Sequence, residues 1–169
     1  MSKNLTSLSA IVLFCLYGCQ EPNQPQQIDL EELTITEIHK AYKNGDYNSE
    51  TLVAAFLKDI DSLDSEINAL TTINTNAITQ AKALDEEYKK TGVLRPLHGI
   101  PIIVKDNINT IGLPTTAGSF ALKDFIPEDD AFIIKQLKGA GAIILAKSNM
   151  AEWAFSAMHT ESSTGGTTR

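Results

Sequence analysis

The chain has 169 residues, of which 43% are hydrophobic and 21% are charged, and its formal net charge is −7. This length and composition predict one globular domain with a hydrophobic core and exclude a disordered chain. The acidic balance argues against a nucleic-acid partner, because the lysines and arginines are scattered and form no basic face that could follow phosphates.

The cysteines and histidines are few. Cys15 and Cys19 both lie near the N-terminus, so the body of the chain has neither a disulfide framework nor a cysteine-based metal site. The three histidines are far apart and lack the spacing of metal ligands: His39, His98 and His159. We therefore expect no metal site.

The first residues have the pattern of a secretory signal peptide. Lys3 precedes an apolar run from Leu5 to Tyr17, which is too short to span a bilayer as an ordinary transmembrane helix. The run leads into Leu-Tyr-Gly-Cys, which resembles the bacterial lipobox, in which the cysteine is lipidated and becomes the mature N-terminus. We expect residues 1–18 to be a lipoprotein signal peptide and Cys19 to be the lipid-attachment site. The alternative is a buried N-terminal helix of the fold.

A polar segment follows the lipobox. Residues 19–28 include QEPNQPQQ, whose composition is typical of a tether between an anchored cysteine and a folded domain. The expected localisation is the bacterial cell envelope, on the periplasmic side or at the outer membrane. The exported protein would be held at the membrane surface by lipid on Cys19.

Three amphipathic helices are predicted in the first half of the remaining chain. Apolar residues recur at helical spacing from Leu30 to Tyr42, from Ser49 to Ile60 and from Ala77 to Lys90. Gly45 and Gly92 are typical helix stops, after the first and third of these helices, and Ser49 is a typical N-cap.

Strands and shorter helices follow this helical lead-in. The predicted strands are Ala69–Ile73, Ile100–Val104 and Ala142–Ala146. Asp129 or Asp130 is expected to cap a helix through Lys138, and Asn149 with Glu152 to open a short helix as a capping pair. Residues 106–130 form a long loop, which favours a functional role in a compact domain. The strand–helix–strand order predicts an α/β architecture with a mostly buried sheet.

Lys105 is the candidate catalytic residue, because it ends the strand predicted at Ile100–Val104. A lysine at a strand end commonly packs its stem and reaches solvent with its ammonium group. If the amine is partly buried, its pKa falls toward the range of a general base, and a neutral amine can take the proton of a serine hydroxyl. The same property would suit a Schiff-base lysine. The loop that follows supplies hydroxyls that could hydrogen-bond an amine, on Thr115, Thr116 and Ser119.

Three segments together resemble one enzyme family. They are PLHGIPIIVKDNINTIGLPTTAGS, AGAIILAKSNMAEWA and SSTGGTTR, and the lead-in INALTTINTNAITQAKALDEE also fits. The combination resembles the N-terminal part of the amidase signature family over roughly residues 30–169. The implied fold is α/β, with a mixed β-sheet core flanked by helices. Residues 29–169 would be the N-terminal, incomplete part of the amidase domain.

The resemblance implies a serine amidohydrolase that acts on C–N bonds of carboxamides. In this family the lysine of the VKDN string, here Lys105, is the base of a Ser-cisSer-Lys triad, and water hydrolyses the acyl-enzyme. Family analogy also places NMAEWAFS along the substrate cleft, with Ala154 as the favoured substrate-binding position. The implied partner is a small-molecule or peptide amide, and no metal or organic cofactor is expected.

The two serines of the family triad have no match in this sequence. Thr168-Arg169 resembles the approach to the GGSSGG-type segment that holds the first of them, and Ser156, Ser162 and Ser163 fit neither serine motif. The expectation is a truncated chain that carries the base without the nucleophile and has no amidase activity by itself. The rival hypotheses are a Schiff-base lyase that uses Lys105 and a non-catalytic lipoprotein module or relic.

Overall fold

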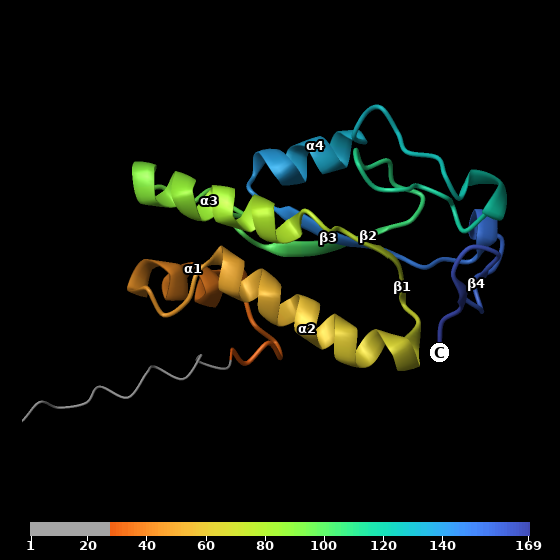
Figure 1. Ribbon diagram of the computed structural model, residues 1–169, viewed down its shortest axis with the longest axis horizontal. Helices are drawn as coiled ribbons and strands as arrows, with labels where there is room; N and C mark the ends of the chain where they lie inside the picture. Colours follow the sequence, from red (N-terminus) through yellow and green to blue (C-terminus); the bar gives the residue numbers. More distant parts are fainter. Residues whose placement is uncertain (1–27) are drawn as a thin grey trace, which may run out of the picture.

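The computed structural model describes residues 28–169 (Figure 1). The predicted signal peptide, the lipid-attachment residue Cys19 and most of the predicted tether lie outside the described residues. The described chain is a mixed α/β structure in which helices cover a small sheet. Its elements in chain order are α1 (Ile35–Asn44), α2 (Ser49–Ile67), β1 (Leu70–Ile73), α3 (Ala77–Thr91), β2 (Pro101–Lys105), the 3₁₀ helix η1 (Phe120–Leu122), α4 (Phe132–Gly139), β3 (Ile143–Ser148), the 3₁₀ helix η2 (Glu152–Ala154), β4 (Glu161–Ser162) and β5 (Gly166–Thr167).

The main sheet has the strand order β1-β3-β2. β3 is the central strand, with β1 antiparallel on one side and β2 parallel on the other. The chain passes from β2 to β3 through α4, which confirms the predicted strand–helix–strand unit. Ile102 pairs with Ile144 but Ile103 pairs with Ala146, so β3 carries one extra residue, Leu145, at this point. This irregularity interrupts the simple alternation of side chains along β3.

The core lies on both faces of the sheet. On one face, helices α2 and α3 pack on Ile143 and Leu145 through Val53 and Ala81. On the other face, α4 and the loop after β2 pack on β2 and β3, in a cluster that contains Val104, Leu113, Ile134 and Ile144. Figure 1 shows α4 on the opposite side of the sheet from α1 and α2. The central strand β3 is therefore buried, as its apolar sequence predicts, whereas β1 is half-buried and β2 exposes Ile103 and Lys105.

Most helix ends follow the predicted signals. Gly45 and Gly92 end α1 and α3 in left-handed conformations, which glycine adopts without steric cost. α1 begins later than predicted, at a capping box formed by Thr34 and Glu37. The cap of α2 is Asn48, whose Oδ1 accepts the N–H of Thr51 at 2.9 Å, so the prediction of Ser49 was wrong by one residue.

Two predicted caps were wrong because their side chains bind elsewhere. The N-cap of α4 is Ala131, and Asp130 instead accepts hydrogen bonds from Lys138 Nζ at 2.8 Å and from the N–H of Ile111 at 2.8 Å. Asn149 donates to the carbonyl of Gly166 and accepts from Ser162, while the Glu152 carboxylate accepts the N–H of Ser163. Long-range partners thus displace the local capping bonds.

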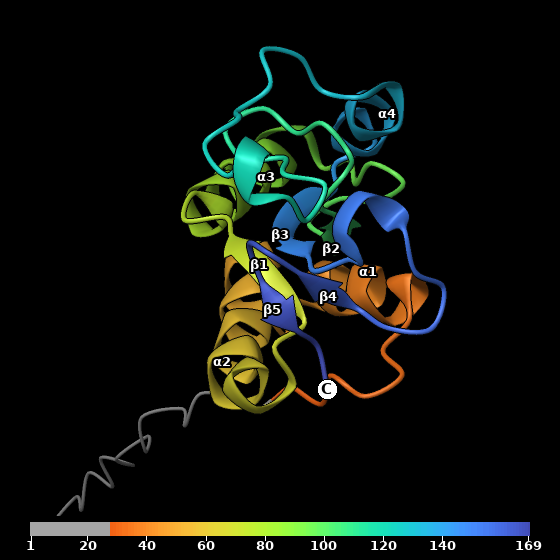
Figure 2. The same cartoon turned by 90° about the vertical axis from the view of Figure 1, so that its right-hand side faces the viewer.

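The C-terminal SSTGGTTR segment is ordered as part of a hairpin. β4 and β5 pair antiparallel, with Ser162 opposite Gly166. Figure 2 shows this hairpin near β1 and the C-terminal end of α2. The Asn68 amide donates to the carbonyl of Gly165 at 2.6 Å, and the N–H of Arg169 donates to the carbonyl of Ile67 at 2.9 Å. None of the helices within residues 28–169 has the length and apolar character needed to cross a bilayer.

Gly99 is predicted to be intolerant of a side chain. Its φ is +72°, and a Cβ at this position would lie 2.9 Å from the Tyr42 hydroxyl and would contact the Ser49 side chain. We expect Gly99→Ala to lower the free energy of unfolding by about 2–4 kcal/mol, through the left-handed backbone and the overpacking together. Urea unfolding followed by circular dichroism measures this change.

The matched control is Gly112→Ala. Gly112 has a similar φ of +81°, but its Cβ would meet nothing within 4 Å. This variant should lose only about 1–2 kcal/mol, which is the backbone cost alone. Equal losses in the two variants would contradict the proposed steric conflict at Gly99.

Candidate active site

Lys105 is the last residue of β2 and lies opposite Ser148 of β3. Its side chain is exposed, which is the common arrangement for a lysine at a strand end, so the partial burial that would favour a neutral amine is not met within residues 28–169. Within residues 28–169 its amine has no hydrogen-bond or ion-pair partner. The side chain lines a cavity of about 300 Å³ whose wall is otherwise formed by residues 150–160. Lys105 is therefore open to a molecule in this cavity, and its role as a base stays a prediction.

Ala154, the predicted substrate-binding residue, lines the same cavity as Lys105. It ends η2, and both Ala154 and Trp153 have left-handed backbone, with φ of 57° and 54°. The N–H of Trp153 donates to the carbonyl of Ala117, which has a φ of 51°. Each such residue costs about 1–2 kcal/mol, and conformations of this kind cluster at functional sites. The structure brings the two predicted site residues together beside a strained backbone, and the role of Ala154 stays a prediction.

The residue after Lys105 organises the loop that follows. Asp106 is fully buried, and its carboxylate accepts hydrogen bonds from the N–H of Thr116 at 3.2 Å, from the Thr116 hydroxyl and from the N–H of Gly118 at 3.4 Å. Its carbonyl accepts the N–H of Ala117 at 3.1 Å. Asp106 thus folds the chain back over the end of β2, because a buried carboxylate must be fully hydrogen-bonded.

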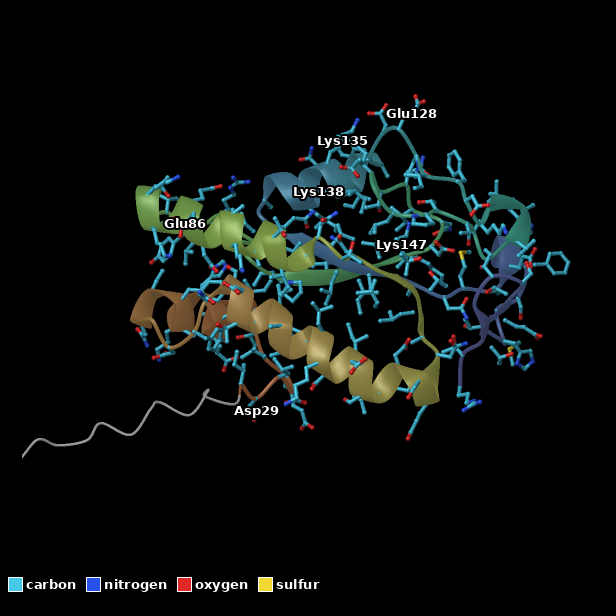
Figure 3. The ribbon with its side chains drawn as sticks, in the orientation of Figure 1. Asp29, Glu86, Glu128, Lys135, Lys138 and Lys147 are labelled. Atoms are coloured by element: carbon cyan, nitrogen blue, oxygen red, sulfur yellow. The ribbon has the colours of Figure 1, made fainter. Side chains whose placement is uncertain are left out.

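The buried lysine of this structure is Lys147, which sequence reasoning missed. It lies on β3 (Figure 3) and has no exposed surface. Its Nζ donates to the carbonyl of Ile108 at 2.6 Å and to the hydroxyl of Thr115 at 3.0 Å. Burial lowers the pKa of Lys147 to about 8, although the Asp106 carboxylate acts in the opposite direction. The Thr115 hydroxyl does bind an amine, as expected of the loop, but the amine is not that of Lys105.

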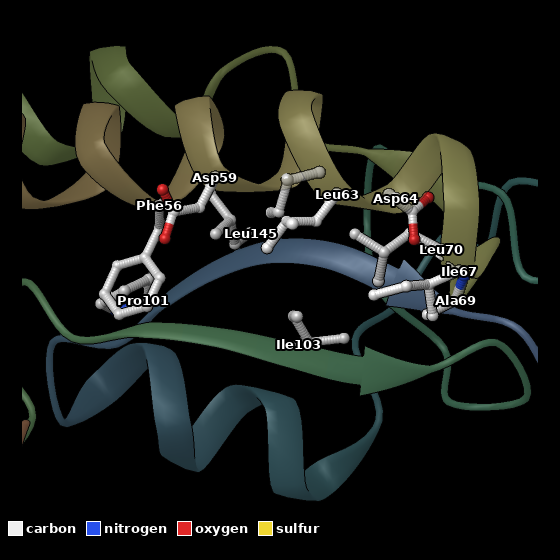
Figure 4. A pocket seen from close by; sticks show the side chains of 11 residues that line it. Phe56, Asp59, Leu63, Asp64, Ile67, Ala69, Leu70, Pro101, Ile103 and Leu145 are labelled. Atoms are coloured by element: carbon white, nitrogen blue, oxygen red, sulfur yellow. Dashed lines mark hydrogen bonds between the residues drawn. The ribbon is translucent and has the colours of Figure 1, made fainter. Parts of the chain in front are cut away.

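A second cavity is apolar and lies apart from Lys105. It has a volume of about 330 Å³ and lies between α2 and the strands β2 and β3 (Figure 4). Leu63, Ile67 and Ile103 line it, and each of these side chains is exposed. Its wall is mainly hydrocarbon, and its charged lining residues, Asp59 and Asp64, are both acidic, so no lining side chain can donate a hydrogen bond to an amide carbonyl.

The described residues offer no cluster suited to a metal ion. Across residues 28–169, no group of three or more histidine, cysteine, aspartate or glutamate side chains is placed to hold one. The charged groups at the candidate site are Lys105 in the first cavity and the buried Asp106 and Lys147 behind it.

Comparison with known proteins decides the family. The family model described as Amidase matches residues 51–169. The chain belongs to the amidase family. Its sequence is 40% identical over 126 residues to a glutamyl-tRNA(Gln) amidotransferase subunit of Alkaliphilus metalliredigens, and it is 39% identical over 131 residues to a putative amidase of Schizosaccharomyces pombe. The resemblance of the VKDN region to the amidase signature family is confirmed.

Solved amidase structures share the fold. The native peptide amidase of Stenotrophomonas maltophilia superposes with a TM-score of 0.78 at 36% sequence identity, over 82% of this chain. This amidase chain spans 30% of that structure, 26% of the A. metalliredigens protein and 22% of the S. pombe protein. The chain described here therefore corresponds to less than a third of the length of each of these relatives.

The buried amine of Lys147 predicts a particular pH dependence of stability. Its pKa is about 8 in the folded chain against an ordinary value of 10.5, so between these pH values the unfolded chain binds more protons. The free energy of unfolding should therefore rise between pH 8 and 9.5, by roughly 1–2 kcal/mol. The measurement stops at pH 9.5 because burial raises the pKa of Tyr42, which reverses the trend once tyrosines ionise in the unfolded chain.

Lys147→Met is the control for this prediction. Methionine has nearly the same length but no ionisable group, so the rise attributed to Lys147 should vanish whatever the stability of the variant at pH 8. Urea unfolding of both proteins at several pH values gives the comparison. Parallel pH curves for the two proteins would contradict the prediction.

Proposed function

We propose that this chain supplies Lys105 as the general base in the serine-dependent hydrolysis of a carboxamide. The observation that carries the proposal is the placement of Lys105 and Ala154 on one cavity, within a fold shared with a peptide amidase. The neutral amine would accept the proton of a serine hydroxyl, the serine oxygen would attack the amide carbon, and ammonia or an amine would leave. Water would then hydrolyse the acyl-enzyme.

The Lys105 side chain is exposed, and the surroundings of its amine decide whether it could act as a base. A base must be neutral to accept a proton, and removal of water from around the amine favours the neutral form. In a complete enzyme, further polypeptide over the cavity would provide this environment. The serines of the triad would also come from outside residues 1–169.

The serines near Lys105 have other partners. Ser156 lines the same cavity as Lys105, and its hydroxyl oxygen accepts the N–H groups of Met158 and His159, both at 3.1 Å. The Ser162 hydroxyl donates to Asn149 at 2.8 Å. These contacts support the view that neither serine is the nucleophile.

For the substrate we infer a small-molecule or peptide amide. One relative is named a peptide amidase, and others are named as part of a glutamyl-tRNA(Gln) amidotransferase. A net charge of −7 is unfavourable for a tRNA substrate, and the proposed export of this protein would separate it from tRNA.

If Lys105 is the base and the triad serines lie outside residues 1–169, the 169-residue chain should be inactive by itself. The purified chain should hydrolyse a simple aryl amide no faster than buffer does, because the base has no nucleophile to activate. Release of the aryl amine followed by absorbance measures this rate, with Lys105→Met as the control. Turnover by the wild-type chain that is lost in Lys105→Met would contradict the proposed absence of the nucleophile.

We also propose that the protein is a lipoprotein anchored through Cys19. A bacterial host expressing the chain and fed an alkyne-labelled fatty acid should incorporate the label, and Cys19→Ser should abolish incorporation. Cys15→Ser is the matched control and should keep the label, because Cys15 lies within the proposed signal peptide. Equal labelling of the wild type and Cys19→Ser would contradict the anchor.

A further inference from the structure

The turn that follows Lys105 is closed by two hydrogen bonds in series that end on Lys147. The N–H of Ile108 donates to the carbonyl of Lys105 at 3.0 Å, and the carbonyl of Ile108 accepts from Lys147 Nζ at 2.6 Å. The backbone of Lys105 is therefore connected to the buried amine through a single residue.

The pairing of β3 with its two neighbouring strands fixes the backbone position of Lys147. β3 is hydrogen-bonded on both sides, with Lys147 opposite Val104 of β2 and Thr72 of β1. Lys147 has no exposed surface, so packing restricts its rotamers. A side chain held in this way can fix the position of a loop more strictly than an exposed one can.

Lys147 supplies the amine donor to this loop, in addition to the hydroxyls of Thr110 and Thr115, which donate to the Ile108 carbonyl at 3.1 and 3.5 Å. The carbonyl of Ile108 and the hydroxyl of Thr115 both accept from Lys147, and the two residues lie at the beginning and the end of the loop's return over β2. Asp106 holds the next part of the loop through Thr116 and Gly118, and its carboxylate interacts favourably with the Lys147 ammonium. An apolar side chain at position 147 would leave both acceptors without this buried partner.

We propose that Lys147 is a positioning residue for Lys105, acting by holding the Lys105–Ile108 turn and the Thr115 end of the loop against the central strand. This inference rests on the proposed role of Lys105 as the base. It predicts that loss of the Lys147 contacts displaces Lys105 and loosens the loop, while the helices keep their structure.

The position of Lys105 is tested by ¹³C-methylation of the lysine amines of the purified chain, which gives each accessible lysine an NMR signal. The signal of Lys105 is assigned by its disappearance in Lys105→Arg. In Lys147→Met it should move from its folded position toward its position in the urea-unfolded chain. In Lys82→Met it should stay in place, because Lys82 forms only a surface ion pair with Glu50.

Loosening of the loop is tested by amide hydrogen exchange in the same variants. The N–H groups of Thr116 and Gly118 should exchange about 10- to 100-fold faster in Lys147→Met, which is the factor expected for loss of a hydrogen bond to a charged group. The amides in the middle of α2 should be unchanged. A purely structural role would accelerate exchange throughout the chain and leave the Lys105 signal of the folded protein in place.

If Lys147→Met does not fold, Thr115→Val tests whether the Lys147 contacts position Lys105. It removes one acceptor of Lys147 and keeps the shape of the side chain, so the Lys105 signal should move in the same direction by a smaller amount. A Lys105 signal that stays at its wild-type position in the folded variants would overturn the proposal. The readout needs no turnover, so this result is independent of whether the chain takes part in amide hydrolysis.

Discussion

The candidate site depends on how two buried charges are hydrogen-bonded on one side of β3. Asp106 and Lys147 have no exposed surface, and neither could be buried without partners. The partners come from the loop after β2: Thr116 and Gly118 bind the carboxylate, and Ile108 binds the amine. The loop therefore folds back over the strand ends, and this return leaves Lys105 at the mouth of a cavity.

The candidate site combines Lys105, at the end of a paired strand, with a cavity wall that contains strained backbone. Lys105 stands at the end of a strand that is paired along its length with β3, whereas the wall of its cavity contains the left-handed residue Ala154, which follows the left-handed Trp153 in the chain. The N–H of Trp153 donates to the carbonyl of Ala117, so the strained segment is hydrogen-bonded to the loop that Asp106 holds in place. Strain of this kind persists only where the surrounding contacts determine the backbone. Met158, which lines this cavity, is 82% exposed, and Phe155, next to Ala154 in the chain, is 95% exposed.

Much of the fold follows from patterns within short segments. The helical stripes of α2 and α3, the glycine stops of α1 and α3 and the apolar strands were predicted from periodicity and turn chemistry. The errors at the predicted caps near α4 and η2 share one physical cause. Asp130, Asn149 and Glu152 had the right local pattern for helix caps, but each forms hydrogen bonds with a distant segment instead. A local pattern does not report such partners.

The sequence by itself determined the family, the α/β class and the strand end that carries Lys105, because these depend on a long motif and on local periodicity. The tertiary structure alone decided which lysine is buried. The predicted strand ended at Ala146, but in the fold β3 continues through Lys147, and the extra residue Leu145 interrupts the alternation of its side chains. Lys147 reaches two acceptors that lie 39 and 32 residues away in the chain. Lys105, which has the same side chain and a similar apolar strand before it, is at the sheet edge and remains exposed. Burial of a charge depends on the partners that folding brings to it, and those partners are set by the whole chain.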